Sequence, residues 1–423
     1  MPTLSEDLAF RGLIHQVTDP ELPKRLDQPG LTVYAGFDPS ADSLHVGNLL
    51  QLCTLRRFQE AGHRPISLAG GGTGMIGDPG GKEDERQLLD LETIEGNLES
   101  IRPQLGQFLD LENDRALLLN NVDWLGRTSV LEFLRDVGKH FTVNQMVGKE
   151  SVKTRFERPD QGISYTEFSY MLLQAYDYLR LHVDHGCDVQ IGGSDQWGNI
   201  TVGVELVRKV CGDEVWGLTT PLIVKPDGTK YGKTESGTVW LDPARTSPFA
   251  MYQFFVNTLD EQVGQLLRFL TFLHHDEIEA LDSETADHPQ RRAAQKALAR
   301  SVVALVHGEG EVAKCEEASG ALFGEEIAGL SEEMLLALTE DAPTTEIARD
   351  QIGEGLTLVD VLERTGLAKS KGEAKRTIDQ GGAYVNNVRQ TDAARTLGPA
   401  DLLHDRYLVV RKGRREVHIV RAT

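Results

Sequence analysis

The first side chains that could do chemistry lie in YAGFDPSADSLHVGN, residues 34–48. A predicted strand ends at the Asp-Pro-Ser of this segment, and Ser43 or Asp42 can cap a helix that starts near Leu44. His45 would then lie in the first helical turn, and Gly47 would let a ligand approach the backbone closely. A ligand site is one interpretation of this arrangement, although a histidine at a helix start is also an ordinary capping residue.

A second candidate is the lysine pair of KYGKT, Lys230 and Lys233. Two lysines on a glycine-containing loop can move to neutralise phosphates, and Thr234 adds a hydroxyl donor. A KxGK segment alone usually marks an exposed turn. Following the His45 segment in the chain, it strengthens the prediction of a site that handles phosphate groups.

The predicted helix TEFSYMLLQAYDYL carries a polar face in an apolar context. Tyr170, Gln174 and Asp177 stand at i, i+4 and i+7, so all three side chains point from one side of the helix. Polar groups need partners when they are buried. The face is therefore either a satisfied polar network between helices or a pocket for an amino acid.

Two glycine-rich segments call for different interpretations. In CDVQIGGSDQWGN, residues 187–199, a glycine pair after a strand and Asp195 at a helix start fit a ribose site. In GGGTGMIGDPGGK, residues 70–82, three glycines match the dinucleotide pattern GxGxxG, but the following GDPGG prevents the helix that the pattern requires. A P-loop ending there also fails, because Glu83 stands where Ser or Thr must hold magnesium.

These motifs lie where strands and helices alternate. We expect strands at residues 31–37, 66–70, 116–120 and 187–193, and helices at residues 44–61, 165–180 and 195–210. Such alternation predicts an α/β fold with a Rossmann-like parallel sheet that binds ligands beyond the carboxyl ends of its strands.

The rest of the chain divides by pattern and charge. We expect the Rossmann-like catalytic domain over residues 1–247, an α-helical domain over 248–320, an acidic linker over 321–353 and a small α+β unit over 354–423. Net charge is −21, yet residues 353–423 carry 13 Lys and Arg against 9 Asp and Glu. A basic tail on an acidic body suggests an RNA or DNA partner, or simply a solvated surface.

Other classes of protein are excluded. No stretch approaches the length of an apolar membrane span, and the amino terminus lacks the pattern of a signal peptide. The four cysteines show no CxxC pair and no metal-ligand spacing with histidine. We therefore expect a cytoplasmic protein with reduced cysteines, no resident metal and no membrane contact.

The segments YAGFDPSADSLH, TEFSYMLLQAYD, QIGGSDQWGNI and KYGKT together resemble the bacterial tyrosyl-tRNA synthetases, over nearly the whole chain. His45-x-Gly47 is similar to the HxGH signature of class I aminoacyl-tRNA synthetases, and KYGKT to their mobile KMSKS loop. The carboxyl-terminal unit resembles the αL-type RNA-binding domain of that family. The resemblance implies activation of L-tyrosine with ATP and transfer to the 3′ end of tRNA(Tyr).

The resemblance also assigns roles to residues. The catalytic group would be Ser40, His45, Lys230, Lys233 and Thr234. The tyrosine pocket would hold Tyr34, Asp78, Tyr170, Gln174, Asp177, Gln190 and Gln196. ATP would meet Gly36, Asp38, His45, Asn48, Gly193, Asp195 and Lys233. Tyrosyl-tRNA synthetases are the standard example of a site that rejects phenylalanine because polar groups would be left unpaired.

Two positions depart from the family pattern. Asn48 replaces the second histidine of HxGH, and Ala35 stands where some members have cysteine. We expect both to shift ATP affinity modestly. ATP would bring Mg²⁺ as a co-substrate, with no permanent cofactor.

RNA contacts and assembly follow from the same resemblance. It implies a homodimer and a helical domain on the anticodon side. RNA contacts are expected at Arg291, Arg292, Lys371, Lys375 and Arg376, although each basic cluster alone is more often a solvated face.

Three alternatives remain at this point. A tryptophanyl-type synthetase shares the fold, but Tyr34, Asp177 and the carboxyl-terminal unit argue against it. A synthetase-derived RNA-binding protein without catalysis is disfavoured by the intact His45 and lysine motifs. A nicotinamide oxidoreductase is the weakest alternative.

Overall fold

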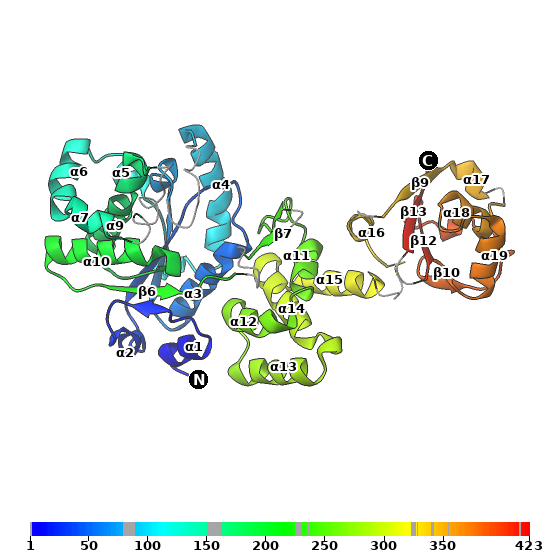
Figure 1. Ribbon diagram of the computed structural model, residues 1–423, viewed down its shortest axis with the longest axis horizontal. Coiled ribbons are helices and arrows are strands. Elements are labelled where there is room, and N and C mark those ends of the chain that lie inside the picture. The colour runs from blue at the N-terminus through cyan, green and yellow to red at the C-terminus, as the bar shows by residue number, and fades with distance from the viewer. Residues whose placement is uncertain are drawn as a thin grey trace. The chain divides into compact units, whose positions relative to one another are not determined.

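A computed structural model describes residues 2–78, 89–149, 152, 162–224, 231–234, 237–322, 327, 329–339, 342–353, 355–413 and 416–423. The chain forms two compact units, one of residues 1–246 and 258–302, the other of residues 247–257 and 303–423. Figure 1 shows the elements of each unit. Within the described ranges, no helix is both long and apolar enough to cross a membrane.

The first unit is built on a six-stranded sheet with the order β1-β6-β5-β2-β3-β4. The strands are β1 (Gln16–Val17), β2 (Thr32–Phe37), β3 (Arg64–Ala69), β4 (Leu117–Asn120), β5 (Cys187–Gly193) and β6 (Trp216–Thr220). All neighbours are parallel except β1 and β6, which pair antiparallel. The predicted α/β fold is confirmed, with a short antiparallel edge strand added.

Helices cover both faces of this sheet, as parallel strands require. Helices α3 (Leu49–Glu60) and α4 (Leu91–Gln107) contact β2, β3 and β4, whereas α9 (Tyr165–His185) and α10 (Trp197–Cys211) contact β5 and β6. Figure 1 shows the two pairs on opposite sides of the strands. The sheet order places β2 beside β5, so the segments that follow these strands meet at one edge.

The start of the helix expected at residues 44–61 is wrong. His45 is extended (φ −130°, ψ 170°), a 3-10 turn spans Val46–Asn48, and α3 begins only at Leu49. Backbone pairing holds this segment open, because the Val46 amide donates to the Val239 carbonyl at 3.0 Å. Ser43 does not cap a helix either; its hydroxyl donates to the Leu44 carbonyl.

The remaining helices of the first unit are short or lie beyond the sheet. They are α1 (Leu4–Phe10), α2 (Leu22–Leu26), α5 (Val122–Leu125), α6 (Val130–Asp136), α7 (Val143–Val147), α12 (Asp260–Leu270), α13 (His275–Asp287) and most of α14 (Ala293–His307). A two-stranded hairpin of β7 (Lys233–Thr234) and β8 (Gly237–Thr238) also belongs here.

The second unit contains a five-stranded sheet with the order β11-β10-β12-β13-β9. Its strands are β9 (Thr344–Ile347), β10 (Ala383–Val385), β11 (Val388–Gln390), β12 (Tyr407–Lys412) and β13 (Glu416–Ala422). Its helices are α11 (Pro248–Val256), α15 (Glu309–Leu322), α16 (Glu332–Leu338), α17 (Arg349–Gly353), α18 (Leu358–Arg364) and α19 (Lys371–Asp379). Ile347 and Ile352, from the stretch expected to be a linker, lie in the core beneath this sheet.

Candidate active site

Helix α9 brings the predicted polar face to the edge where β2 and β5 end. Ser164 caps the helix by accepting a hydrogen bond from the Glu167 amide, and Gly186 ends it in the left-handed conformation. Tyr170 and Asp177 are buried, and Gln174 is partly buried. The polar face therefore lies inside the protein, where each group needs a partner.

Asp177 has its partners in the segment after β4. The Trp124 indole Nε1 donates to its Oδ1 at 2.7 Å, and the Asn121 amide Nδ2 donates to its Oδ2 at 2.9 Å. Burial raises the pKa of Asp177 to about 7, and these two hydrogen bonds oppose that rise. The carboxyl group is thus fixed in place, while its charge depends on what binds beside it.

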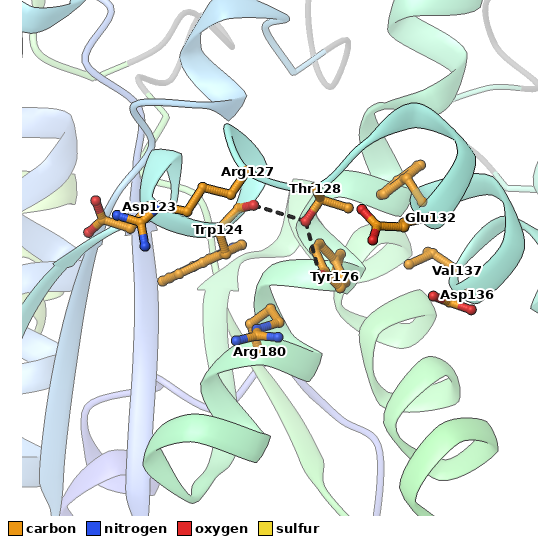
Figure 2. A pocket seen from close by; sticks show the side chains of 10 residues that line it. Asp123, Trp124, Arg127, Thr128, Glu132, Asp136, Val137, Tyr176 and Arg180 are labelled. Carbon is orange, nitrogen blue, oxygen red and sulfur yellow. Dashed lines mark hydrogen bonds between the residues drawn. The ribbon is translucent and has the colours of Figure 1, made fainter.

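A pocket with a volume of about 320 Å³ lies on another side of Trp124. It is lined by Asp123, Trp124, Arg127, Thr128, Glu132, Phe133, Asp136, Val137, Tyr176 and Arg180. Figure 2 shows the Thr128 hydroxyl joined to the Trp124 carbonyl and the Tyr176 hydroxyl. None of the predicted tyrosine-binding side chains lines this pocket.

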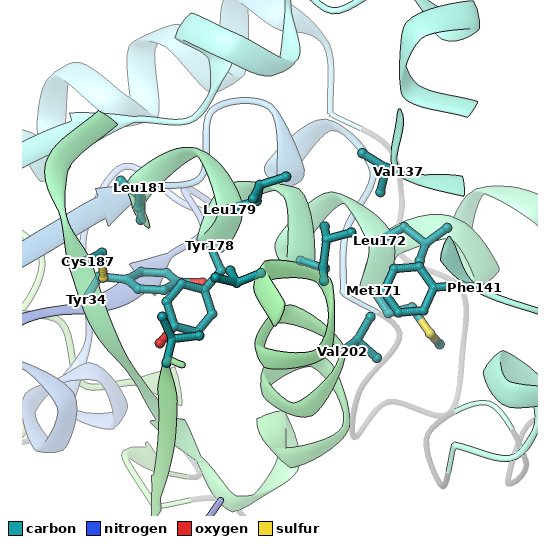
Figure 3. Packing of buried hydrophobic residues seen from close by; sticks show 14 of the residues in the cluster. Tyr34, Val137, Phe141, Met171, Leu172, Tyr178, Leu179, Leu181, Cys187 and Val202 are labelled. Atoms are coloured by element: carbon teal, nitrogen blue, oxygen red, sulfur yellow. The ribbon is translucent and has the colours of Figure 1, made fainter. Parts of the chain in front are cut away.

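Tyr34 stands out because its hydroxyl is buried and has no hydrogen-bond partner in the described ranges. The side chain is 1 % exposed, and among the described residues nothing forms a hydrogen bond with the hydroxyl oxygen. Its ring meets Tyr178 edge-on with the centroids 5.3 Å apart (Figure 3). Burial, and next the nearby Asp177 charge, raise the pKa of Tyr34. A neutral phenol therefore faces an acidic group with one hydrogen bond unused.

Tyr170 connects the same helix to the end of β2. Its hydroxyl donates to Asp38 Oδ2 at 3.1 Å, and the Thr73 hydroxyl donates to Asp38 Oδ1 at 3.0 Å. Thr73 in turn accepts from Asn121 Nδ2 at 2.9 Å. One chain of hydrogen bonds thus links Asp38, an expected ATP contact, to Asp177, an expected tyrosine contact.

The second polar cluster joins Gln174, Gln196 and Asp78, three of the residues expected in the tyrosine pocket. Gln196 Nε2 donates to Asp78 Oδ2 at 2.5 Å, and Gln174 Nε2 donates to Gln196 Oε1 at 3.2 Å. Asn199 Nδ2 contacts both glutamine side chains, at 3.0 and 3.2 Å. Nearby on β5, Gln190 is 2 % exposed, and its Oε1 lacks a hydrogen bond within the described part of the chain.

The strand ends provide space at the backbone. Gly36 is the exposed position of β2, and a Cβ added there would meet no atom within 4 Å. A Cβ on Gly193 would lie 2.7 Å from Asp195 Oδ1, so glycine is needed to bring this carboxylate against the strand end. Asp195 and Ser40 are both exposed beside this edge.

The two segments that the sequence predicts to handle phosphate groups meet in the folded chain. A Cβ on Gly232 would lie 3.4 Å from Val46 Cβ and 3.5 Å from the Gly47 amide nitrogen. The His45 backbone bridges to Trp240, and the Asn48 side-chain Oδ1 accepts from the His45 amide at 3.0 Å. Lys230 lies outside the described residues, and for Lys233 and Thr234 only the backbone strand β7 is described.

The backbone amides of Gly71 and Gly72, in the glycine run at residues 70–82, already have hydrogen-bond partners, which argues against a dinucleotide site there. The Gly71 amide donates to Asn120 Oδ1 at 3.1 Å, and the Gly72 amide donates to Asn121 Oδ1 at 2.7 Å. These N–H groups hold asparagine side chains, so they are not directed at a pyrophosphate.

The expected RNA-binding residues occupy two places. Arg291 bonds Glu284 at 2.8 Å, and Arg292 donates to the Thr258 carbonyl at 3.1 Å. In the second unit Lys371 pairs with Asp360 at 2.7 Å, while Lys375 and Arg376 are exposed on α19.

Sequence reasoning missed the residues that hold the site together. Asn121 and Trp124 fix Asp177, Thr73 fixes Asp38, and Asn199 fixes the glutamines. The one available signal was the position of Asn120 at the end of a strand and of Asn121 directly after it, where ligand-binding residues gather in parallel sheets.

Family models match the chain along most of its length. The model for tRNA synthetases class I (W and Y) matches residues 27–324, and that for the tyrosine–tRNA ligase SYY-like C-terminal domain matches residues 334–420. A tyrosine–tRNA ligase of Roseiflexus castenholzii is 52% identical over 100% of both chains. One of Opitutus terrae is 51% identical over 99% of both.

Solved structures agree with this assignment. A truncated mitochondrial tyrosyl-tRNA synthetase of Aspergillus nidulans has a TM-score of 0.69 and 35% identity, over 76% of this chain and 95% of that one. A tryptophanyl-tRNA synthetase of Plasmodium falciparum shares the fold, with a TM-score of 0.55, 14% identity and coverage of 78% and 87%. The chain belongs to the class I tRNA synthetases of the tryptophanyl and tyrosyl type and, within them, to the tyrosine–tRNA ligases.

Proposed function

We propose that this tyrosine–tRNA ligase activates L-tyrosine with ATP at the edge where β2 and β5 end, and then transfers tyrosine to the 3′ end of tRNA(Tyr). The observation that carries the assignment of the site is the buried Tyr34 hydroxyl, which has no hydrogen-bond partner among the residues that the structure describes, beside the Asp177 carboxyl group. A phenol both donates and accepts a hydrogen bond, so the substrate hydroxyl would satisfy both groups at once.

In this proposal the substrate side chain points at Tyr34 and Asp177, and its ammonium group is held by Asp78, Tyr170 and Gln174. The buried carboxylate of Asp78, already bonded by Gln196, supports a cation site there. Gln190 and Gln196 complete the pocket. Gln190 Oε1 has no hydrogen bond in the part of the chain that the structure describes, which supports a polar ligand on that side.

ATP would lie across the open strand ends at Gly36, Gly193 and Asp195, with the Asp195 carboxylate on the ribose hydroxyls. Asp38, Ser40 and Asn48 would line the approach to the phosphates. Space at Gly36 and the close approach at Gly193 support this placement. Magnesium enters with ATP as part of the substrate.

The activation step needs no general base. The tyrosine carboxylate attacks the α-phosphorus in line, a new carboxyl–phosphate bond forms, and the bond to pyrophosphate breaks. His45, Lys230, Lys233 and Thr234 would stabilise the charge that develops on the phosphates, so positioning and electrostatics supply the rate. The packing of Gly232 against Val46 supports bringing the lysine loop to the His45 turn.

RNA binding and location complete the proposal. We propose the same division into a catalytic domain, a helical domain, an acidic linker and a carboxyl-terminal unit, with boundaries at residues 247, 320 and 353. The tRNA would contact the helical domain at Arg291 and Arg292, and the carboxyl-terminal unit at Lys371, Lys375 and Arg376. The four cysteines are free, which supports work in a reducing cytoplasm.

We also propose that two chains form a homodimer through the apolar side chains of the α6–α7 region. Val130 and Leu131 on α6 are 73% and 80% exposed, and Leu134 on α6 and Val143 on α7 are also exposed. Four large apolar side chains in water within one region favour a protein partner, and the family resemblance makes that partner a second copy.

The test is ATP–pyrophosphate exchange with each of the twenty amino acids, using the full chain. Exchange with tyrosine, and none with phenylalanine or tryptophan, is the expected result. Folded protein that binds tRNA(Tyr) but exchanges with no amino acid would contradict the catalytic proposal and leave an RNA-binding relative.

A further inference from the structure

The carboxyl ends of α9 and α10 place a histidine, a cysteine and a carboxylate together. One donor atom each of His182, Cys211 and Asp213 lies within 4.8 Å of the other two. The His182 side chain is 16% exposed, that of Asp213 is 61% exposed, and Cys211 is partly buried. The cluster is therefore open to solvent, away from the residues assigned to tyrosine and ATP.

The hydrogen bonds of His182 fix which ring nitrogen faces the cluster. Its Nδ1 lies 2.8 Å from the Cys187 carbonyl oxygen, which can only accept, so Nδ1 carries the proton. In the neutral ring, Nε2 then presents its lone pair, 3.1 Å from Asp213 Oδ2. Histidines that bind metal use this same arrangement, in which the second ring nitrogen donates to a carbonyl.

Two electron-rich atoms facing each other require a cation between them or a proton on the ring. A proton on the ring would let His182 and Asp213 form an ion pair, but it would not involve the neighbouring Cys211 sulfur. A metal ion that accepts sulfur, nitrogen and oxygen satisfies all three.

The local backbone favours the same conclusion. Cys211 is the last residue of α10, and Gly212 (φ +78°) turns the chain so that Asp213 returns beside it. His182 lies in the last turn of α9. Helix carboxyl ends carry partial negative charge, and both of these ends favour a cation.

We propose that His182, Cys211 and Asp213 form a zinc-type site, with water in the fourth position. A tetrahedral zinc ion holds such donors about 3.3–3.8 Å apart, so rotations of the side chains would close the set. Binding releases the thiol proton to the buffer and forms the sulfur–metal bond. The ion would link the carboxyl-terminal ends of α9 and α10.

The test is cobalt titration of the full chain after removal of metals by a chelator and gel filtration. We expect a thiolate-to-cobalt absorption band in the near ultraviolet that saturates at one equivalent and disappears when zinc is added. Zinc should also raise the melting temperature by about 2 °C or more, because it binds the folded chain alone.

Variants separate this site from adventitious binding. Cys211→Ser should abolish the band and weaken zinc binding at least about tenfold. Asp213→Asn should weaken zinc binding to a smaller degree. His185→Gln, on the same helix end but outside the cluster, is the matched control and should bind as the unaltered chain does. No band, or a band of equal strength in Cys211→Ser, would overturn the proposal.

Discussion

At the scale of single residues, the site rests on buried polar groups that the folded chain only half satisfies. Asp177 has both oxygens bonded, whereas the Tyr34 hydroxyl beside it has no partner among the described residues. An unpaired buried hydroxyl costs stability unless a ligand pairs it. In the proposed pocket the hydroxyl of tyrosine would recover this cost on binding, whereas phenylalanine, which has no hydroxyl, would not.

Tyr34→Phe tests this difference. We expect the kcat/KM for tyrosine in pyrophosphate exchange to fall about tenfold, which corresponds to one lost hydrogen bond of about 1.4 kcal/mol. Discrimination against phenylalanine should fall with it. Stability to urea without ligand should stay level or rise, because no existing hydrogen bond is removed. A clear loss of stability in the ligand-free variant would contradict the assignment.

Asp177 predicts a pH dependence of stability. Its pKa is about 7 when folded and close to 3.8 when unfolded, so the folded chain holds the proton more tightly between these values. The free energy of unfolding should therefore decrease as pH rises from about 4 to about 7, by at most about 1.4 kcal/mol per unit from this group. Urea unfolding without ligand measures it. In Asp177→Asn the slope should be smaller, and an unchanged slope would assign the effect to other groups.

At the scale of elements, the close packing of Gly232 against the His45 turn joins two motifs far apart in sequence. Gly232 has φ +86°, a conformation that side chains rarely adopt. Its neighbours are Val46 and Gly47, so the hairpin position and the turn depend on each other.

Gly232→Ala should raise the KM for ATP or lower the activation rate about five- to tenfold, since left-handed backbone costs alanine about 1–2 kcal/mol. Tyrosine binding should change little. The matched control is Gly212→Ala, with φ +78° and no atom within 4 Å of the added Cβ. That control should lower the melting temperature without altering ATP kinetics. Equal effects on ATP kinetics in both variants would show that backbone strain acts through the stability of the whole fold, and not through contact between Gly232 and the His45 turn.

At the scale of the whole molecule, charge separates the two proposed tasks. The part of the chain that precedes residue 353, where we place activation of tyrosine, has a net negative charge, whereas residues 353–423 are net basic. Exposed cations attract the phosphates of RNA without reading its sequence, and salt weakens that attraction.

Charge reversal of Lys375 and Arg376 to Glu should lower the kcat/KM for tRNA about tenfold or more and reduce its salt dependence, while pyrophosphate exchange stays unchanged. Lys314→Glu, an exposed lysine elsewhere in the second unit, is the control. If the control alone lost aminoacylation, or if both variants lost it equally, the proposal that α19 binds RNA would be contradicted.

The proposed dimer predicts an effect of Leu131→Asp on mass in solution. A charge in an apolar interface is costly, so light scattering after gel filtration should show the monomer or a dimer at least about tenfold weaker. Leu259→Asp changes another exposed leucine, 54% exposed, and should leave the mass unaltered. A stable dimer in both variants would place the interface elsewhere.

The sequence by itself determined the class of fold and the family, and it named the side chains that we propose to face the substrate. Period and spacing are local properties, so alternating strands and helices and the i, i+4, i+7 face of α9 are visible without a structure. Even locally, one expectation was wrong. His45 lies in extended chain because Trp240 and Val239, about 190 residues away, pair with its segment.

Only the tertiary structure decided which partners fix those groups. Asn121 and Trp124 lie more than 50 residues from Asp177 in the chain, and His182 lies 29 residues from Cys211. Nothing in local sequence encodes such meetings, because they depend on the order of strands in the sheet and on where each helix ends. The sequence identifies the groups that could touch a substrate, and the packing of the sheet sets their hydrogen bonds, their burial and hence their pKa values.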